Sequence, residues 1–380
     1  MVKPIVCIVL SAPEMFGFMK GQPERIRKLG YNPIIISSAS ESLDKLTEAE
    51  ELERITISIL RPISLWHDVK TFYQLFRIFY EKSPSIVMLS GPKAIFLGSV
   101  AAWFCMVPKR LIIYHGMRQE NLTGPLRWIL DICDRLSFFS ATDALTVSPS
   151  LRELVLNRKL CFRDKVKSIY PGTPNGIDLR NFRITTELNE QSDDTRRLIG
   201  LPLHVPVIGY LGRVTEDKGI ADLYKSFRIL KEKFPDLYLI CIGPMEINTE
   251  AGGKLVIEMK NDKSVFFTGL VKNVSPYLRL LDVHVFPSSR EGFGQSIIEA
   301  AALSIPTVAY NVTGVRDAIV ADKTGFLVSY GDVEALTKKI ELYLLNKNLR
   351  NIHGEASRSR IGKEFSQDLI WGYYLDVFNN

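Results

Sequence analysis

The sequence predicts an α/β protein with two doubly wound, Rossmann-like parallel sheets that face a central cleft. Short apolar runs alternate with helix-length segments along the whole chain, which is the pattern of βαβ units. The 380 residues are enough for two domains of ordinary size. The polar stretch 185–197 lies near the middle and predicts a linker between them.

Six strand-length apolar runs fall in the first half of the chain and five in the second. Short apolar runs are typical of parallel strands that are buried on both faces. The predicted strands are 5–10, 32–37, 86–89, 110–114, 144–147, 167–169, 207–210, 237–242, 265–268, 283–286 and 307–309. Helices are predicted at 41–52, 66–81 and 220–233.

These elements predict a first domain over residues 1–184 and a second domain over residues 185–365. The aromatic-rich segment 366–380 is expected to form a helix that packs back on the first domain. Open parallel sheets bind ligands outside the carboxyl ends of their strands, so we expect the site in the cleft between the domains.

The most informative motif is 287–300, PSSREGFGQSIIEA, which follows the predicted strand 283–286. A strand, a glycine turn (Gly292, Phe293, Gly294) and a helix place free N–H groups at the mouth of a sheet, where they suit phosphate. Glu299 lies inside the helix and leans toward its N-terminus. Its carboxylate suits the two hydroxyls of a ribose, and the loop residue Glu291 suits those of a sugar.

A second loop of this kind follows the strand 207–210. Gly212 gives a flexible strand end, and Gly219 opens the helix 220–233. Between them, Arg213 offers a planar fork and Lys218 a point charge, and both suit a diphosphate.

Further candidates lie at the ends of other strands. Gly243, Thr268 and Leu270 sit where the backbone could approach a flat nucleobase, although simple turns explain them as well. His115 follows the strand 110–114 and could bind a sugar hydroxyl or orient an acceptor. Gly17 lies in the loop after the first strand, which could contact phosphate or acceptor.

Several functional classes are disfavoured. The five cysteines are scattered and form no C-x-x-C pair, which argues for reduced thiols in a cytoplasmic protein and against a zinc site. The chain has no G-x-S-x-G elbow of an acyl transferase and no G-x-G-x-x-G fingerprint of a nicotinamide enzyme. We find no secretory signal and no metal-ligand spacing, so no metal is expected.

Charge is distributed unevenly along the chain. Residues 1–180 contain 24 Lys and Arg against 17 Asp and Glu, a net charge of +7, and the remainder has a net charge of −1. A basic first half favours an anionic partner, such as a membrane surface or a phosphorylated lipid, or a solvated surface without a partner. Nucleic acid is disfavoured because no RNA- or DNA-binding motif is present.

Together these residues resemble the retaining glycosyltransferases of family 4, which have the GT-B fold. Residues 287–300 match the family's E-x7-E element, and 212–219 match its donor-phosphate element. Further matches lie at 147–148, 175–178 and 324–328, and the bacterial capsule and exopolysaccharide subgroup is matched at 16–21, 91–94, 101–103 and 115–120. The loop 15–18 departs from the Gly-Gly pattern of the wider family.

The resemblance implies a metal-independent, retaining hexosyl transfer from a nucleoside-diphosphate sugar, with UDP favoured and an N-acetylated amino sugar expected. It implies a polyprenyl-diphosphate-linked saccharide as acceptor, at the cytoplasmic face of the bacterial membrane, and no further cofactor. Glu291, His115, Arg213 and Lys218 would be the catalytic residues. Alternatives are a GDP-mannose-type transferase, a nucleotide-sugar epimerase or hydrolase of the same fold, and a relative that binds nucleotide without turnover.

Overall fold

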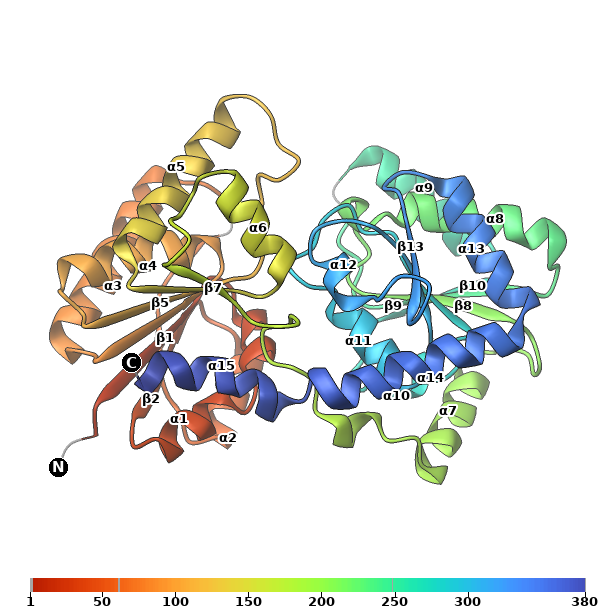
Figure 1. Cartoon of the computed structure of the whole chain (residues 1–380), viewed down its shortest axis with the longest axis horizontal. Helices are drawn as coiled ribbons and strands as arrows, with labels where there is room; N and C mark the ends of the chain where they lie inside the picture. The colour runs from red at the N-terminus through yellow and green to blue at the C-terminus, as the bar shows by residue number, and fades with distance from the viewer. Residues whose placement is uncertain (1–2, 61, 248, 380) are drawn as a thin grey trace. The chain divides into compact units, whose positions relative to one another are not determined.

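The computed structural model describes residues 3–60, 62–247 and 249–379, and the chain divides into two compact units (Figure 1). The first unit runs to Asn175 and also includes the chain from Ile370 onward, and the second unit is Gly176–Leu369. The predicted domain boundary after residue 184 therefore falls inside the second unit, which begins at Gly176.

The first unit contains a seven-stranded parallel sheet with the strand order β3-β2-β1-β4-β5-β6-β7. Its helices cover both faces, with α3, α4 and α5 on one face and α1, α2 and α15 on the other (Figure 1). The strands are β1 (Ile5–Leu10), β2 (Asn32–Ser37), β3 (Glu53–Thr56), β4 (Ile86–Ser90), β5 (Lys109–Tyr114), β6 (Asp143–Thr146) and β7 (Val166–Ser168). The helices are η1 (Pro13–Met19), α1 (Gln22–Lys28), α2 (Glu41–Ala49), α3 (Leu65–Lys82), α4 (Pro92–Phe104), α5 (Pro125–Ser140) and α6 (Pro149–Asn157).

The second unit contains a six-stranded parallel sheet with the order β10-β9-β8-β11-β12-β13. Its strands are β8 (Val207–Leu211), β9 (Tyr238–Ile242), β10 (Val265–Gly269), β11 (Val283–Phe286), β12 (Thr307–Tyr310) and β13 (Gly325–Val328). Its helices are η2 (Leu179–Phe182), α7 (Thr186–Leu198), η3 (Glu216–Lys218), α8 (Ile220–Lys233), α9 (Glu250–Asn261), α10 (Ser275–Leu278), α11 (Gln295–Ala302), α12 (Val315–Ala318), α13 (Val333–Leu345) and α14 (Lys347–Glu364). α15 (Gln367–Asn379) ends the chain.

The predicted fold class, two doubly wound parallel sheets with flanking helices, is confirmed. All eleven predicted strands are present, and the central strands β4, β8, β11 and β12 are buried along their whole length. In β1, for example, Val6 to Leu10 are fully buried. In both sheets the strand order reverses beside the first strand of the unit, β1 or β8. Ligands of open α/β sheets bind outside such reversal points, at the carboxyl ends of the strands.

The predicted linker at 185–197 is wrong. Residues Thr186–Leu198 form helix α7, which Thr185 caps by accepting a hydrogen bond from the N–H of Leu188. Leu188, Ser192 and Thr195 form a buried face, and the Ser192 hydroxyl donates to the carbonyl oxygen of Pro276. The stretch is polar because its other faces are exposed, so composition alone hid an ordered helix.

The C-terminal segment forms a helix, as expected, and its last residues belong to the first unit. The Tyr374 hydroxyl donates a 2.6 Å hydrogen bond to the carbonyl oxygen of Pro174. The rings of Tyr31 and Phe378 lie 5.6 Å apart, and Arg25 lies over the ring of Trp371.

Candidate active site

Two loops of the second unit meet at the carboxyl ends of the adjacent strands β8 and β11. One loop runs from Gly212 to Gly219 and contains η3, and the other, residues 287–294, leads into α11. In parallel strands these ends lie at the same edge of the sheet, so the loops are neighbours although they are far apart in sequence.

The centre of this edge is an ion pair between Lys218 and Glu291. The Nζ atom of Lys218 lies 2.6 Å from Oε1 of Glu291, and their side chains are only 15% and 14% exposed. The desolvation of a largely buried pair offsets much of its Coulomb attraction, so removal of either partner would leave the other charge uncompensated. The structure therefore brings together the two charged residues that the sequence placed in separate motifs.

The backbone of Asp217 fixes how the two loops meet. Its carbonyl oxygen accepts hydrogen bonds from the N–H and the hydroxyl of Ser289, at 3.0 and 2.8 Å. Its carboxylate accepts a 2.6 Å bond from Thr215 and lies 3.6 Å from the guanidinium of Arg290. Burial alone would raise the pKa of Asp217, but the Thr215 hydroxyl and the positive charge of Lys218 hold it below its usual value.

Two glycines allow the close approach. Gly219 has a φ of +73°, and a Cβ atom there would lie 2.0 Å from the carbonyl oxygen of Pro287. Gly314, in the loop after β12, has a φ of +78°, and a Cβ atom there would lie 2.6 Å from the carbonyl oxygen of Gly292. Any other residue at either position would push the loops apart.

The helix α11 begins as the sequence predicted, with Gly294 as its N-cap. Gly294 has no side chain to cap the helix. The N–H groups of Gln295 and Ile297 donate to the carbonyl oxygens of Phe293 and Gly294, at 2.9 and 3.0 Å, so the N–H of Ser296 is the one in this turn that points to a ligand site. The hydroxyl of Ser296, in the same turn, is buried without a hydrogen-bond partner among the described residues. Phe293 packs on the ring of Phe365 at 5.7 Å, which fixes the approach to the helix.

Glu299 lies in the second turn of α11. Burial raises the pKa of this carboxyl group to about 7. No hydrogen bond or ion pair joins Glu299 to another residue within the described part of the chain. The Glu299 side chain is only partly buried, and a ligand with hydroxyl donors would supply the hydrogen bonds that its carboxyl group lacks within the protein.

Arg213 does not join the Lys218–Glu291 pair in this structure. Its guanidinium lies 2.7 Å from the carboxylate of Glu246, and both side chains are substantially exposed. The carbonyl oxygen of Arg213 accepts a bond from the Tyr210 hydroxyl, which fixes the backbone after Gly212. The side chain could exchange Glu246 for a ligand anion without a change of fold.

The remaining candidates of the second unit surround the ends of β9 and β10. Gly243 has a φ of +134°, and a Cβ atom there would lie 2.1 Å from the carbonyl oxygen of Gly212. The Thr268 hydroxyl donates to the carbonyl oxygen of Gly269, and Leu270 is 83% exposed. Gly243 is therefore needed for the packing of two strand ends, whereas Leu270 is an exposed apolar residue at the same edge.

In the first unit, His115 follows β5 and contacts two neighbours. Its Nε2 atom lies 2.7 Å from the hydroxyl oxygen of Ser90, at the end of β4, and its ring lies 5.5 Å from that of Phe18. Burial lowers the pKa of His115 to about 4, so the ring is neutral near pH 7. Gly17 lies beside Phe18 in η1, is exposed, and has nothing within 4 Å of where a Cβ would stand.

Sequence reasoning missed several residues of these edges. Ser90, Asp217, Gly314, Glu246 and Ser296 were not predicted. Gly314 had a usable signal, since a glycine lies between a strand and a short helix. The contacts of the others depend on residues more than 20 positions away, or on burial, and no local pattern shows these.

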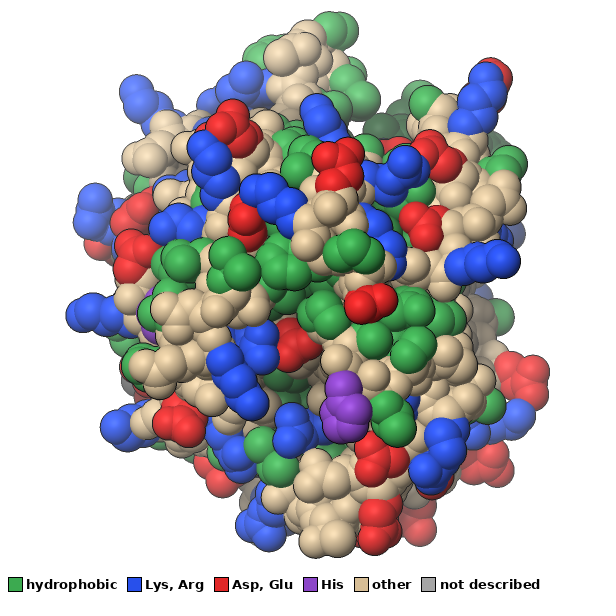
Figure 2. Space-filling view, turned by 90° about the vertical axis from the view of Figure 1, so that its right-hand side faces the viewer, with side chains coloured by type: hydrophobic (Ala, Val, Ile, Leu, Met, Phe, Trp, Pro, Cys, Tyr) green, Lys and Arg blue, Asp and Glu red, His purple; other side chains and the backbone are tan. Residues whose placement is uncertain are grey.

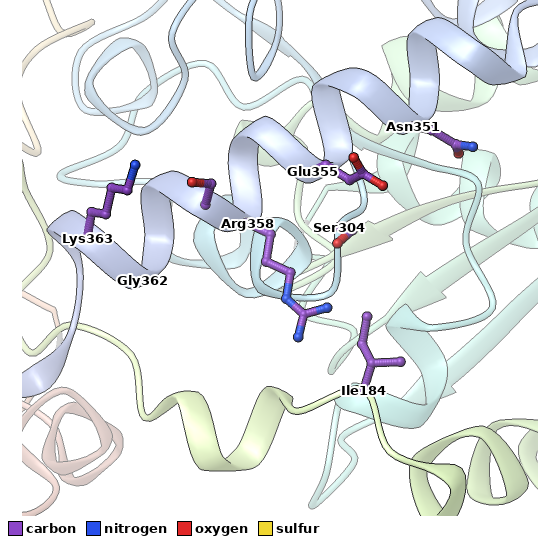
Figure 3. Close-up of a pocket in the computed structure, with 8 residues that line it drawn as sticks. Ile184, Ser304, Asn351, Glu355, Arg358, Gly362 and Lys363 are labelled. Carbon is purple, nitrogen blue, oxygen red and sulfur yellow. The ribbon is translucent and has the colours of Figure 1, made fainter.

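Two pockets of the second unit differ in their relation to these loops. One, of about 390 Å³, is lined by Glu216, Asp217, Gly219, Ala221, Asp222, Pro287, Ser289 and Tyr330. It adjoins the meeting point of the two loops. The other, of about 640 Å³, lies along α14, and Arg358 points into it toward Ile184 while Lys363 points away (Figure 3). It contains none of the predicted site residues.

Among the described residues, no cluster of three or more His, Cys, Asp or Glu side chains is placed to hold a metal ion. No helix in the described ranges has the length and apolarity needed to cross a bilayer.

The family described as Glycosyl transferases group 1 matches residues 191–360. The capsular polysaccharide biosynthesis glycosyltransferase CapM of Staphylococcus aureus is 31% identical over 371 residues, which cover 98% of this chain and 96% of CapM. The chain belongs to the group 1 glycosyl transferases. The predicted likeness to capsule glycosyltransferases is confirmed by the CapM match.

Two further comparisons cover most of the chain. The UDP-Gal:alpha-D-GlcNAc-diphosphoundecaprenol alpha-1,3-galactosyltransferase of Escherichia coli is 23% identical over 332 residues, covering 85% of this chain and 83% of that enzyme. The crystal structure of HepE from Anabaena in complex with UDP and glucose has a TM-score of 0.81 at 15% identity, covering 98% of this chain and 99% of HepE. This structural likeness shows a shared fold.

Proposed function

We propose that this glycosyltransferase moves a hexosyl group, with retention and without a metal ion, from a UDP-sugar to a polyprenyl-diphosphate-linked saccharide in capsule or exopolysaccharide synthesis. The observation that carries the proposal is the desolvated Lys218–Glu291 pair at the carboxyl ends of β8 and β11, directly before the uncapped N-terminus of α11. A cation and free N–H groups suit a diphosphate, and an acid beside them suits sugar hydroxyls.

The reaction breaks the bond between the sugar C1 and the diphosphate oxygen and forms a bond from C1 to the acceptor oxygen. The acceptor's hydroxyl proton passes to the leaving diphosphate, so no protein base is required. Negative charge develops on the diphosphate, and Lys218, Arg213 and the N–H groups at α11 would stabilise it. These groups would neutralise the leaving group without a metal ion, and no cofactor beyond the nucleotide sugar is required.

Glu299 would hold the ribose of the nucleotide through two hydrogen bonds. Its lack of a protein partner and its raised pKa are expected of an acid whose partner is a ligand. Glu291 would hold the donor sugar beside the positive charge of Lys218. In the first unit, the neutral His115 beside Ser90 could accept a hydrogen bond from a donor or acceptor hydroxyl.

The choice of UDP and of a lipid-linked acceptor is supported by relatives. The Escherichia coli relative is named for UDP-galactose and a diphosphoundecaprenol acceptor, and HepE was crystallised with UDP. We propose an N-acetylated amino sugar as the transferred group and a location at the inner face of the cell membrane. The basic first half would contact anionic lipid there.

The test is a transfer assay with an undecaprenyl-diphosphate-linked saccharide and a panel of UDP-N-acetylhexosamines, UDP-hexoses and GDP-mannose, with and without EDTA. We expect UDP release that requires the lipid-linked acceptor and is unaffected by EDTA. NMR of the product should show that the anomeric configuration of the donor is retained.

The same assay separates the alternatives. Consumption of donor without acceptor would indicate an epimerase or hydrolase, and turnover of GDP-mannose alone would overturn the choice of UDP. Nucleotide binding without turnover of any donor would indicate a binding-only relative and would contradict the proposal.

A further inference from the structure

One face of the first unit exposes an unusual number of aromatic side chains. It is the outer surface of α3, α4 and α5, which lie together on the same face of the first sheet (Figure 1). Its apolar members are Trp66, Val69, Tyr73, Tyr80, Trp103, Phe104, Trp128, Ile129, Leu136 and Phe139, each more than a third exposed. We call this surface the aromatic face.

Ring contacts link the three helices of the aromatic face. The rings of Phe72 on α3 and Phe104 on α4 lie 6.3 Å apart, and Trp103 on α4 lies 6.2 Å from Phe139 on α5. On α3 the exposed residues 66, 69, 73 and 80 form one stripe, whereas Thr71, Leu75 and Phe79 form the buried stripe. The helix therefore has an apolar stripe for the core and a second apolar stripe that faces solvent.

Tryptophan is concentrated on this face. The chain has four tryptophans, and Trp66, Trp103 and Trp128 are 82%, 44% and 66% exposed. The fourth, Trp371, is 7% exposed in α15. Tryptophan and tyrosine favour the boundary between lipid headgroups and acyl chains, where an amphipathic ring can be both apolar and hydrated. Monomeric proteins rarely expose a continuous apolar surface of this kind without a partner.

The charges of the same helices favour an anionic partner. Each acidic residue of these helices has a protein partner: Asp68 pairs with Lys93, Glu81 with Arg77, and Asp131 with Arg158, while Asp134 accepts bonds from Tyr114 and Gln119. By contrast, Lys70 and Arg135 are exposed and join no ion pair among the described residues. By comparison, the surface drawn in Figure 2 mixes Lys and Arg with Asp and Glu.

We propose that the aromatic face inserts its tryptophan and tyrosine rings shallowly into an anionic lipid bilayer, with Lys70 and Arg135 contacting lipid phosphates. Interfacial helices combine apolar rings with flanking cations in this way. The inference rests on the proposed function for its purpose, since a lipid-linked acceptor lies in a bilayer. It also names a mode of binding, ring insertion, that the basic charge of the first half alone would not produce.

The test uses vesicles of phosphatidylcholine and phosphatidylglycerol that contain neither saccharide acceptor nor nucleotide, so that its outcome does not depend on transfer. The protein should cosediment with these vesicles, and a Trp66→Ser/Trp128→Ser variant should bind at least tenfold more weakly. Leu203→Ser is the matched control, because Leu203 is 71% exposed in the second unit and its loss should leave binding unchanged. Both changes alter exposed side chains, so melting temperatures should stay close to that of the wild type.

Two measurements distinguish insertion of the rings from charge attraction alone: the salt dependence of vesicle binding and the depth of the tryptophan rings in the bilayer. At 0.5 M salt charge attraction is largely screened, so ring insertion predicts that a measurable fraction of binding persists. Brominated acyl chains should quench the fluorescence of a variant that retains only Trp128, with phenylalanine at the other three tryptophan positions, and unbrominated vesicles of the same charge should not.

Three results would overturn the inference. They are equal vesicle binding by the double variant, complete loss of binding at 0.5 M salt, or wild-type self-association that the double variant abolishes. The last would make this face an interface between two copies of the chain. Vesicle binding by a protein that transfers no sugar would leave the inference standing and refute the proposed function instead.

Discussion

Replacing Glu299 by glutamine should remove a pH dependence from the stability of the second unit. Burial raises the pKa of this carboxyl from its ordinary value of 4.5 to about 7. The folded protein therefore binds this proton more tightly than the unfolded chain does. Glu299 consequently destabilises the fold increasingly as the pH rises from about 4.5 through about 7, and the penalty levels off above that pH.

The size of the effect follows from the shift. Each pKa unit corresponds to about 1.4 kcal/mol, so the full penalty is about 3 kcal/mol, of which roughly 2–3 kcal/mol develops between pH 5 and pH 8. Relative to the wild type, the free energy of unfolding of Glu299→Gln should therefore increase by roughly 2–3 kcal/mol between pH 5 and pH 8. Glu232→Gln, on the exposed side of α8, is the matched control and should track the wild type.

The assay is urea denaturation followed by far-UV circular dichroism at pH 5 and at pH 8. Tryptophan fluorescence is unsuitable, because Trp66, Trp103, Trp128 and Trp371 all lie in the first unit. A difference between Glu299→Gln and wild type that stays constant from pH 5 to pH 8 would contradict a raised pKa of Glu299 in the folded protein. It would mean that the carboxyl group ionises in the folded protein as it does in water.

Three other predictions concern the site. Lys218→Ala and Glu291→Gln should each lower the turnover of sugar transfer at least tenfold with an unchanged circular dichroism spectrum, and wild-type turnover in either variant would contradict their roles. Gly219→Ala should lower the melting temperature more than Gly331→Ala. Both glycines have positive φ, but only a Cβ at Gly219 would clash, 2.0 Å from a carbonyl oxygen. Equal melting temperatures would argue against the close contact of the loops. NMR should find His115 titrating near pH 4. The stability that its neutral ring provides should therefore be lost as the pH falls from about 6.5 toward 4. Titration near 6.5 would show that the ring is solvated.

The sheets could be predicted because strands that are buried on both faces appear in the sequence as short apolar runs. The runs that became β1 and β11 are wholly apolar or nearly so. β3, Glu53-Arg-Ile-Thr56, was missed because it pairs only with β2 and contains a single large apolar residue. β13 was recognised as a motif but not as a strand, since it is short and begins with Gly325.

The candidate site was predictable at the level of loops rather than contacts. The strand, turn and helix order correctly placed Gly294 at the start of α11, and the glycines around Lys218 marked the second loop. The sequence could not show that Lys218 pairs with Glu291, 73 positions away, or that Arg213 pairs with Glu246. Such pairs depend on which strands are neighbours and on loop conformations set by distant backbone atoms, such as the carbonyl oxygen of Asp217.

The most direct test of the account is the thermal stabilisation of the protein by UDP, compared with GDP and ADP, without metal and then with magnesium. A ligand that binds only the folded state stabilises it by about 2.7 kcal/mol at a hundred times its Kd. UDP should raise the melting temperature without metal, and Lys218→Ala and Glu299→Ala should largely abolish the shift. No shift with any nucleotide, or an equal shift in both variants, would contradict the claim that the carboxyl edge of the second sheet is the donor site.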